Sequence, residues 1–104
     1  MQGSQLTVYA ANQTHRIHHM TVVDWLLDEI RKVGIQGATV VAVAEGVDTQ
    51  GRYHAARFFE LGEQSVAVTV AGTDGEIDAL LDIIRQAGMH LFYTRYPVEY
   101  GLLG

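Results

Sequence analysis

Residues 46–64 of the chain read GVDTQGRYHAARFFELGEQ and separate two halves that have similar patterns. Each half predicts a strand, an amphipathic helix and a second strand, whereas this segment shows no clean period. Connections longer than about 12–15 residues are uncommon in compact domains and are usually either functional or disordered. The segment holds two arginines, a histidine, a tyrosine and two phenylalanines, and a disordered spacer would be poor in aromatic residues. We therefore expect a loop that binds a ligand or a partner.

The part of the chain before this segment predicts a strand, a helix and a strand. LTVYAA (6–11) has the composition of a strand. Apolar residues then recur at spacings of three and four, as on one face of an amphipathic helix: Val22, Val23, Leu26, Leu27, Ile30 and Val33. Gly34 follows where a helix commonly ends in a left-handed conformation. ATVVAVA (38–44) predicts a strand that is buried on both faces or lies near a subunit contact.

The part of the chain after the segment repeats this order. SVAVTVA (65–71) predicts a strand, and Thr73 with Glu76 matches a capping box at the start of a helix. A second apolar stripe precedes Gly88: Ile77, Leu80, Leu81, Ile84 and Ala87. HLFYTRYPVEY (90–100) predicts a last strand, whose proline places at least one end at a sheet edge or a bulge.

Two βαβ halves in a chain of 104 residues predict a single α+β domain, residues 1–104. The expected arrangement is the ferredoxin-like βαββαβ sandwich: four mainly antiparallel strands with both helices on one face. The other face of the sheet would then be bare. Because the strands are so apolar, we expect this face to be buried against copies of the same chain, in a closed cyclic oligomer.

Charge and composition exclude several classes of protein. Seven basic residues against twelve acidic ones give a net charge of −5, which argues against a dedicated nucleic-acid binder. The absence of cysteine excludes disulfides, thiolate metal sites and thiol nucleophiles. No apolar run approaches the about 20 residues needed to span a bilayer, and the first residues lack the features of a secretion signal. We expect a cytoplasmic protein without direct membrane insertion.

Catalytic motifs are absent from the sequence. Ser4 and Ser65 are the only serines, and neither lies in a nucleophile-elbow context. Asp74, Asp78 and Asp82 share one helix face, but without a partner base they read as ordinary solvated residues. No Walker-type glycine loop is present. We therefore expect a protein that is not an enzyme and that requires no cofactor.

The run GIQGATVVAVAEGVDTQGRYHAARFFELGE (34–63) resembles the centre of the PII-like signalling proteins. Within them it is most similar to a small branch of uncharacterised domains that shows a G-x-x-G-A-T-V stretch, a glycine-marked loop, an Ile-His-Thr-like triplet and a Leu-Ser-Glu turn. Here the triplet is Tyr53–Ala55 and the turn is Leu61–Glu63. LTVYAANQTHRIHH (6–19) is similar to the strand and histidine-bearing loop of this branch, and the resemblance extends over residues 6–100.

The resemblance implies a ferredoxin-like homotrimer whose inter-subunit clefts bind a small effector, an adenine nucleotide such as AMP or ADP, alone or together with bicarbonate. The long loop between the second and third strands, called the T-loop, would change order on binding. It would then regulate a membrane transporter for bicarbonate, ammonium or a cation, or another partner protein. One long loop between two rigid halves suits such a switch.

Two features depart from the pattern of the family. Gly46 is followed by Val47 and Asp48 where the branch often has Gly-Phe-Gly, and an aspartate would repel a phosphate. Lys32 is the only lysine, so the lysine that grips phosphate in nitrogen-regulatory PII proteins is missing. A mono- or diphosphate, a cyclic nucleotide or a small anion fits this charge supply better than a triphosphate.

Arg52, His54 and Arg57 lie close together on the loop, and with Gly46 they are the predicted effector contacts there. A guanidinium offers paired donors to a phosphate or a carboxylate. The alternative is that these are solvated loop charges, or that Arg57 pairs with a nearby glutamate.

Arg95 is the fifth predicted effector contact, because the resemblance places the last strand beside the inter-subunit cleft. The alternative is a salt bridge with a carboxylate such as Glu45. On the loop, Tyr53, Phe58 and Phe59 are predicted to contact the partner protein, and Tyr53 is also a candidate modification site. Packing or stacking is the alternative for these three aromatic residues.

His15, His18 and His19 form a cluster in the polar stretch before the first helix. Imidazole is a ligand for Zn²⁺, Cu²⁺ and Ni²⁺, so a metal-binding or metal-tolerance protein of the same fold is the alternative function. The other interpretation is a polar loop that docks near the central one. An enzyme is a third alternative, since this fold hosts many unrelated activities.

Overall fold

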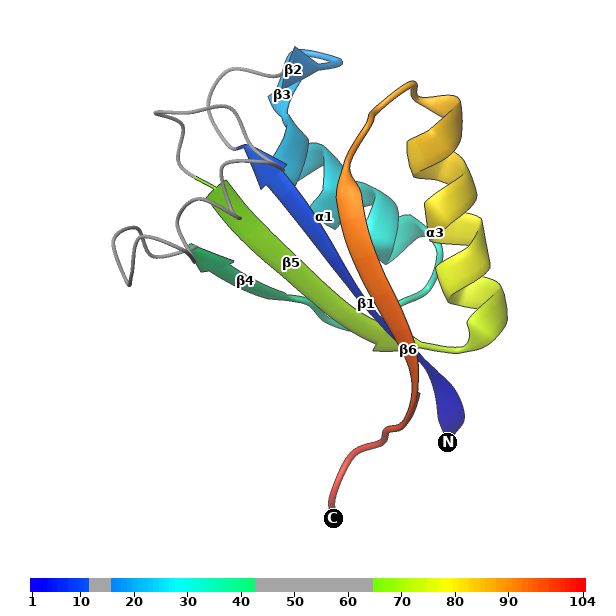
Figure 1. Ribbon diagram of the computed structural model, residues 1–104. Helices are drawn as coiled ribbons and strands as arrows, with labels where there is room; N and C mark the ends of the chain where they lie inside the picture. Colours follow the sequence, from blue (N-terminus) through cyan, green and yellow to red (C-terminus); the bar gives the residue numbers. More distant parts are fainter. Residues whose placement is uncertain (12–15, 43–64) are drawn as a thin grey trace, which may run out of the picture.

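The structure is a computed structural model that describes residues 1–11, 16–42 and 65–104 (Figure 1). Four strands form one sheet in the order β4–β5–β1–β6, and each neighbouring pair is antiparallel. Their bounds are Gln2–Ala11 for β1, Thr39–Ala42 for β4, Ser65–Gly72 for β5 and Phe92–Glu99 for β6.

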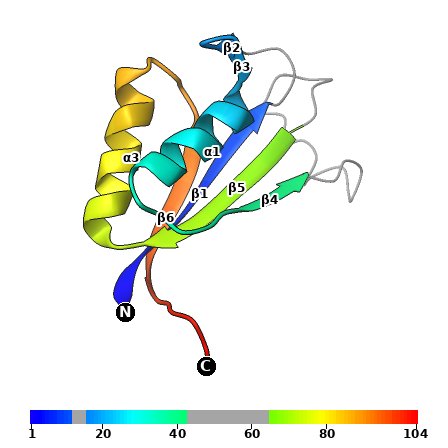
Figure 2. The ribbon, with the colours of Figure 1, turned by 180° about the vertical axis from the view of Figure 1, so that it is seen from behind.

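Two helices, α1 (Val22–Lys32) and α3 (Asp74–Gln86), cover one face of this sheet, as the view from behind shows (Figure 2). The predicted ferredoxin-like α+β sandwich is therefore confirmed. The predicted T-loop lies in residues 43–64, outside the described residues. No helix in the described parts of the chain is long and apolar enough to cross a membrane.

Local sequence signals set the bounds of both helices. Before α1, the Oγ1 of Thr21 accepts a hydrogen bond from the backbone N–H of Asp24 at 3.1 Å. Before α3, the Oγ1 of Thr73 accepts from the N–H of Glu76 at 3.1 Å, while the N–H of Thr73 donates to Oε1 of Glu76 at 2.9 Å. This is the predicted capping box. Gly34 follows α1 with a φ of 94°, the predicted left-handed conformation.

The core lies between the helices and the two central strands. Its buried apolar side chains come from β1, β5, α1, α3 and the turn after α1: Leu6, Val8, Ala10, Val22, Val23, Trp25, Leu26, Ile30, Ile35, Val66, Val68, Val70, Ile77, Leu80 and Ile84. The predicted helical stripes supply much of this set. The strand side chains are at even positions, because successive strand residues point to opposite faces of a sheet.

A small hairpin before α1 was not predicted from the sequence. Arg16–Ile17 (β2) pairs antiparallel with Met20–Thr21 (β3) around a two-residue turn. The turn residues, His18 and His19, have φ values of 50° and 65°. Two-residue hairpin turns require positive φ and usually carry Asn-Gly or Asp-Gly, so a His-His pair gives no signal for this turn.

The prediction that the strand over residues 38–44 is buried on both faces is wrong for the single chain. All four residues of β4 are exposed, with 45% of Val40 and 53% of Val41 accessible. The physical reason is that β4 lies at the end of the strand order, paired with β5 alone among the described strands. The other possibility, a subunit contact, stays a prediction.

The sheet face away from the helices carries no charged side chain in the described residues. Strand register aligns four threonines in one row across the sheet: Thr39, Thr69, Thr7 and Thr94. The hydroxyl groups of Thr7 and Thr69 are 2.9 Å apart. The next row holds Val41, Ala67, Tyr9 and Phe92. We call this surface the bare face, defined by the odd positions of β1, β4 and β5 and the even positions of β6.

Candidate functional site

Residues 12–15 and 43–64, which the structure leaves undescribed, are joined to strand ends at the same end of the sheet. Ala42, the last residue of β4, pairs with Val66 of β5, so the chain leaves and re-enters the sheet on neighbouring strands around residues 43–64. Ala11, the last residue of β1, pairs with Ser65 at the same end, just before residues 12–15. Figure 1 shows the β2–β3 hairpin at this end as well. The points at which residues 43–64 and residues 12–15 join the described chain therefore lie at one end of the sheet.

Most of the predicted site residues lie outside the described residues, so their contacts stay predictions: Gly46, Arg52, Tyr53, His54, Arg57, Phe58, Phe59 and His15. Of the predicted set, the structure places Arg95, His18 and His19.

An aromatic pair lies at the end of the sheet where the loop begins, and sequence reasoning did not identify it. The rings of Tyr9 and Phe92 are 5.7 Å apart between centroids, with their planes tilted by 44°. Both side chains are on the bare face, and 38% of Phe92 is exposed. The aromatic content of residues 90–100 was the available signal, but only strand pairing shows which aromatic residues meet.

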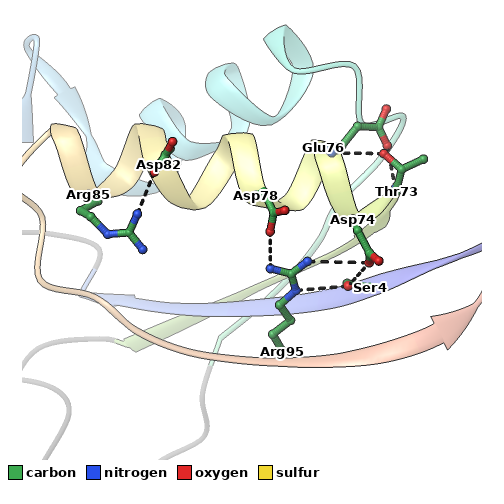
Figure 3. A network of polar contacts seen from close by, with 8 residues as sticks. All are labelled: Ser4, Thr73, Asp74, Glu76, Asp78, Asp82, Arg85 and Arg95. Atoms are coloured by element: carbon green, nitrogen blue, oxygen red, sulfur yellow. Dashed lines mark hydrogen bonds and ion pairs between the residues drawn. The ribbon is translucent and has the colours of Figure 1, made fainter.

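Arg95 lies on β6 opposite Leu6 of β1, so its side chain points to the helix-covered face. Its Nη1 donates to Oδ1 of Asp78 at 2.6 Å, and its Nη2 lies 3.7 Å from Oδ1 of Asp74 (Figure 3). Its Nε donates to the Oγ of Ser4 at 3.1 Å, and this hydroxyl donates in turn to Asp74. Ser4 is only 5% exposed, and these two bonds satisfy its hydroxyl.

This arrangement, the Arg95 cluster (Ser4, Asp74, Asp78 and Arg95), joins one guanidinium to two carboxylates. The formal charge of the cluster is therefore negative, because two carboxylates outnumber one guanidinium, and this charge opposes the approach of an anion to Arg95. Of the two alternatives for Arg95, the described residues show an ion pair, formed with the helix aspartates; Glu45 lies outside the described residues. Contact of Arg95 with an effector stays a prediction.

The acidic row on α3 is solvated, as the sequence predicted, but its three aspartates have basic partners that the sequence did not predict. Asp74 and Asp78 bind Arg95, and Oδ1 of Asp82 accepts a hydrogen bond from Nη1 of Arg85 at 2.7 Å (Figure 3). The sequence showed the spacing of the row. It did not show that an arginine from the last strand lies over the first turns of this helix.

The histidine cluster is only partly placed. His18 and His19 are both exposed at the hairpin turn. In the described parts of the chain, no group of three or more histidine, aspartate or glutamate side chains is placed to hold a metal ion. The metal site therefore stays a prediction that the described residues do not support.

Comparison with known proteins finds a match to one family model. The model of the family DUF190, described as "Uncharacterized ACR", matches residues 3–100. No curated protein sequence matches the chain.

Several solved structures share the fold. The PII-like protein CPII from Thiomonas intermedia K12, bound to ADP, AMP and acetate, has a TM-score of 0.67 at 13% identity, with 97% of this chain and 90% of that chain covered. CPII bound to ADP and bicarbonate has a TM-score of 0.63 at 13% identity, covering 98% and 91%. A PII-like signalling protein from Thermus thermophilus has a TM-score of 0.61 at 13% identity, covering 93% and 86%. At such identities the likeness shows the fold, and the predicted PII-like resemblance is confirmed.

Proposed function

The chain belongs to the DUF190 family, and from its PII-like fold we propose that it is a cytoplasmic regulator that binds an adenine nucleotide, AMP or ADP. We propose that the bound form controls a membrane transporter through residues 46–64. The observation that carries this proposal is the likeness over nearly the whole chain to CPII, whose structures hold ADP and AMP. Bicarbonate is a candidate second effector, since one CPII structure holds it together with ADP.

The position of the long segment supports a regulatory role. Residues 43–64 are flanked by Ala42 and Ser65, which lie at the same end of the paired strands β4 and β5. A ligand held at this end of the sheet can therefore bias the conformation of the whole segment. Such order–disorder changes of one segment are a common form of switch. Arg52 and Arg57 supply the positive charge that a nucleotide phosphate needs in this segment.

We propose that the protein acts as a homotrimer in which the bare faces are turned toward the threefold axis and the effector binds between subunits. The bare face supports this because it is free of charge in the described residues and exposes large apolar side chains. Val41 is 53% exposed and Tyr96 is 49% exposed. Exposed apolar surface of this kind marks interaction sites. Closed rings are the usual form of such assemblies.

Isothermal titration of the protein with AMP, ADP, ATP and cyclic AMP, with and without bicarbonate, tests the proposal. We expect AMP or ADP to bind in the micromolar range, at one site per chain. In R52A/R57A, affinity should fall at least about tenfold, because a hydrogen bond to a charged group contributes about 1.5–3 kcal/mol. R85A is the matched control: its side chain pairs with Asp82 on the surface of α3, so its affinity should equal that of the wild type.

Three results would count against the proposal. One is the absence of heat with every nucleotide, and a response to Zn²⁺, Cu²⁺ or Ni²⁺ alone would favour the histidine cluster instead. The second is equal loss of affinity in R85A. The third is turnover of the nucleotide during the titration, because we propose a binding protein and not an enzyme.

A further inference from the structure

The helix side of the sheet is covered at its centre and accessible at its outer strands. One row of side chains on this side holds, in strand order, Val40, Val68, Val8 and Tyr93. The two central residues are 2% and 3% exposed, whereas 45% of Val40 and 46% of Tyr93 is accessible. Among the described residues, the buried core takes no side chain from β6. The helices therefore leave the helix side of β6 open to a ligand.

Tyr93 is the aromatic residue of β6 that lies on this side. Phe92 and Tyr96 point to the bare face, where the ring of Phe92 lies beside that of Tyr9 and the hydroxyl of Tyr96 accepts a hydrogen bond from Gln5. The alternation of side chains along a strand turns Tyr93 to the other side. An aromatic ring that is about half exposed can stack on a flat ligand.

The charge beside Tyr93 indicates which part of a nucleotide can lie there. The Arg95 cluster is on the same side of β6, two residues or about 7 Å along the strand. It joins one guanidinium to two carboxylates, so its formal charge is negative (Figure 3). This charge repels a phosphate group. An uncharged ring, such as a nucleobase, meets no such repulsion.

Tyr93 also lies near the end of the sheet at which residues 43–64 join the described chain. It is the second residue of β6, after Phe92. Phe92 shares a row with Val41, which is one residue from the last residue of β4. A nucleotide with its base on Tyr93 can therefore extend its phosphates toward this end of the sheet, away from the Arg95 cluster.

We propose that the ring of Tyr93 stacks on the base of the bound adenine nucleotide and gives the site a preference for purines. This inference rests on the proposed function and adds the residue that recognises the base. Stacking acts through the ring, so the hydroxyl group of Tyr93 is not required. A purine covers more of an aromatic ring than a pyrimidine does, so AMP should bind more tightly than UMP.

Isothermal titration of the wild type, Y93A and Y93F with AMP and with UMP tests this assignment. Y93A removes the ring and should weaken the binding of AMP by about tenfold, within the range for one stacked base. Y93F keeps the ring and is the matched control, so its affinity for AMP should equal that of the wild type. The ratio of the affinities for AMP and UMP should fall in Y93A alone, because both ligands carry the same phosphate. Circular dichroism checks that the variants fold.

Several results would overturn the stacking and leave the proposed function standing. One is a Y93A protein that binds AMP as tightly as the wild type. Another is a loss of equal size for AMP and UMP in Y93A, which would mean a general defect of the site. A third is an equal loss in Y93F, which would assign the effect to the hydroxyl group. A wild type that binds AMP and UMP equally would contradict the purine preference. A wild type that binds no nucleotide would overturn both this inference and the proposed function.

Discussion

The two faces of the sheet differ in what covers them. On β1, Leu6 and Val8 point to the helices and are 0% and 3% exposed, while their neighbours Thr7 and Tyr9 point to the bare face and remain half-buried. The chain itself covers the first face with α1 and α3. The second face is as free of charge as an interior surface, yet nothing among the described residues covers it. The first face should therefore decide whether the chain folds, and the second whether copies assemble.

The largest effect should come from a cavity on the helix-covered face. Leu80 of α3 is 0% exposed within the core, so L80A should lower the free energy of unfolding by about 2–5 kcal/mol. Denaturant unfolding at one fixed protein concentration measures the change. A79L, at the exposed neighbouring position, is the control and should stay close to the wild type. Equal effects of the two substitutions would contradict the assignment of the core.

A charge on the bare face should affect assembly rather than folding. Thr69 lies in the middle of the threonine row, so T69K would place one ammonium group from each copy inside a trimer. We expect association to weaken at least tenfold, about 1.4 kcal/mol or more, with near-native secondary structure by circular dichroism. Light scattering over a dilution series measures this association. A79K on the outer surface of α3 is the control; a T69K protein that assembles like the wild type would show that the bare face is not the interface.

A smaller effect is expected at the rim of the helix-covered face. D78N removes one carboxylate from Arg95, and the ion pair is partly exposed, with 27% of the arginine and 65% of the aspartate side chain accessible. Such pairs contribute about 0–1 kcal/mol, so the free energy of unfolding should fall by no more than this. Thermal unfolding of D78N and of D82N compares the stability that each ion pair contributes. The pair of Asp82 with Arg85 lies outside the Arg95 cluster and serves as the reference. A loss well above this range would mean that the Arg95 cluster holds β6 in place.

The smallest effect concerns the outer surface of α1. Lys32, hydrogen-bonded to Asp28, lowers the pKa of the Asp28 carboxyl below 3.8, with Arg31 adding to the effect. A carboxyl with a lowered folded pKa stabilises the fold above its unfolded pKa, and this contribution is lost as pH falls through the folded value. The stability difference between wild type and D28N should therefore be present at pH 7 and decrease as the pH is lowered toward about 2, through the folded pKa of the carboxyl. A difference that stays constant between these pH values would contradict this assignment.

The parts of the fold that could be predicted from sequence depend on neighbours in the chain. The stripe that contains Leu26, the capping box at Thr73 and the left-handed Gly34 follow from spacings of three or four residues. These features hold in the structure because local hydrogen bonds and one buried helix face decide them.

The parts that could not be predicted depend on residues far apart in sequence. β1 begins at Gln2, whereas the sequence predicted a strand from Leu6, because residues 2–5 lack the apolar alternation that indicates a strand. The close approach of the backbone at Gly3, where an added Cβ would lie 2.0 Å from the backbone oxygen of Gly72, also depends on a residue far away in sequence. The partners of Arg95 come from another element, and the exposure of β4 follows from strand order. For the candidate site, sequence supplied the loop residues, and the structure supplied the end of the sheet to which the loop is attached.

Native mass spectrometry of the wild-type protein, recorded without nucleotide and with ADP, tests the central claim most directly because it counts chains and ligands together. We predict a species of three 11.5 kDa chains that takes up one nucleotide per chain. A species of one chain that takes up no ADP or AMP at any tested concentration would contradict both the bare-face assembly and the regulatory function.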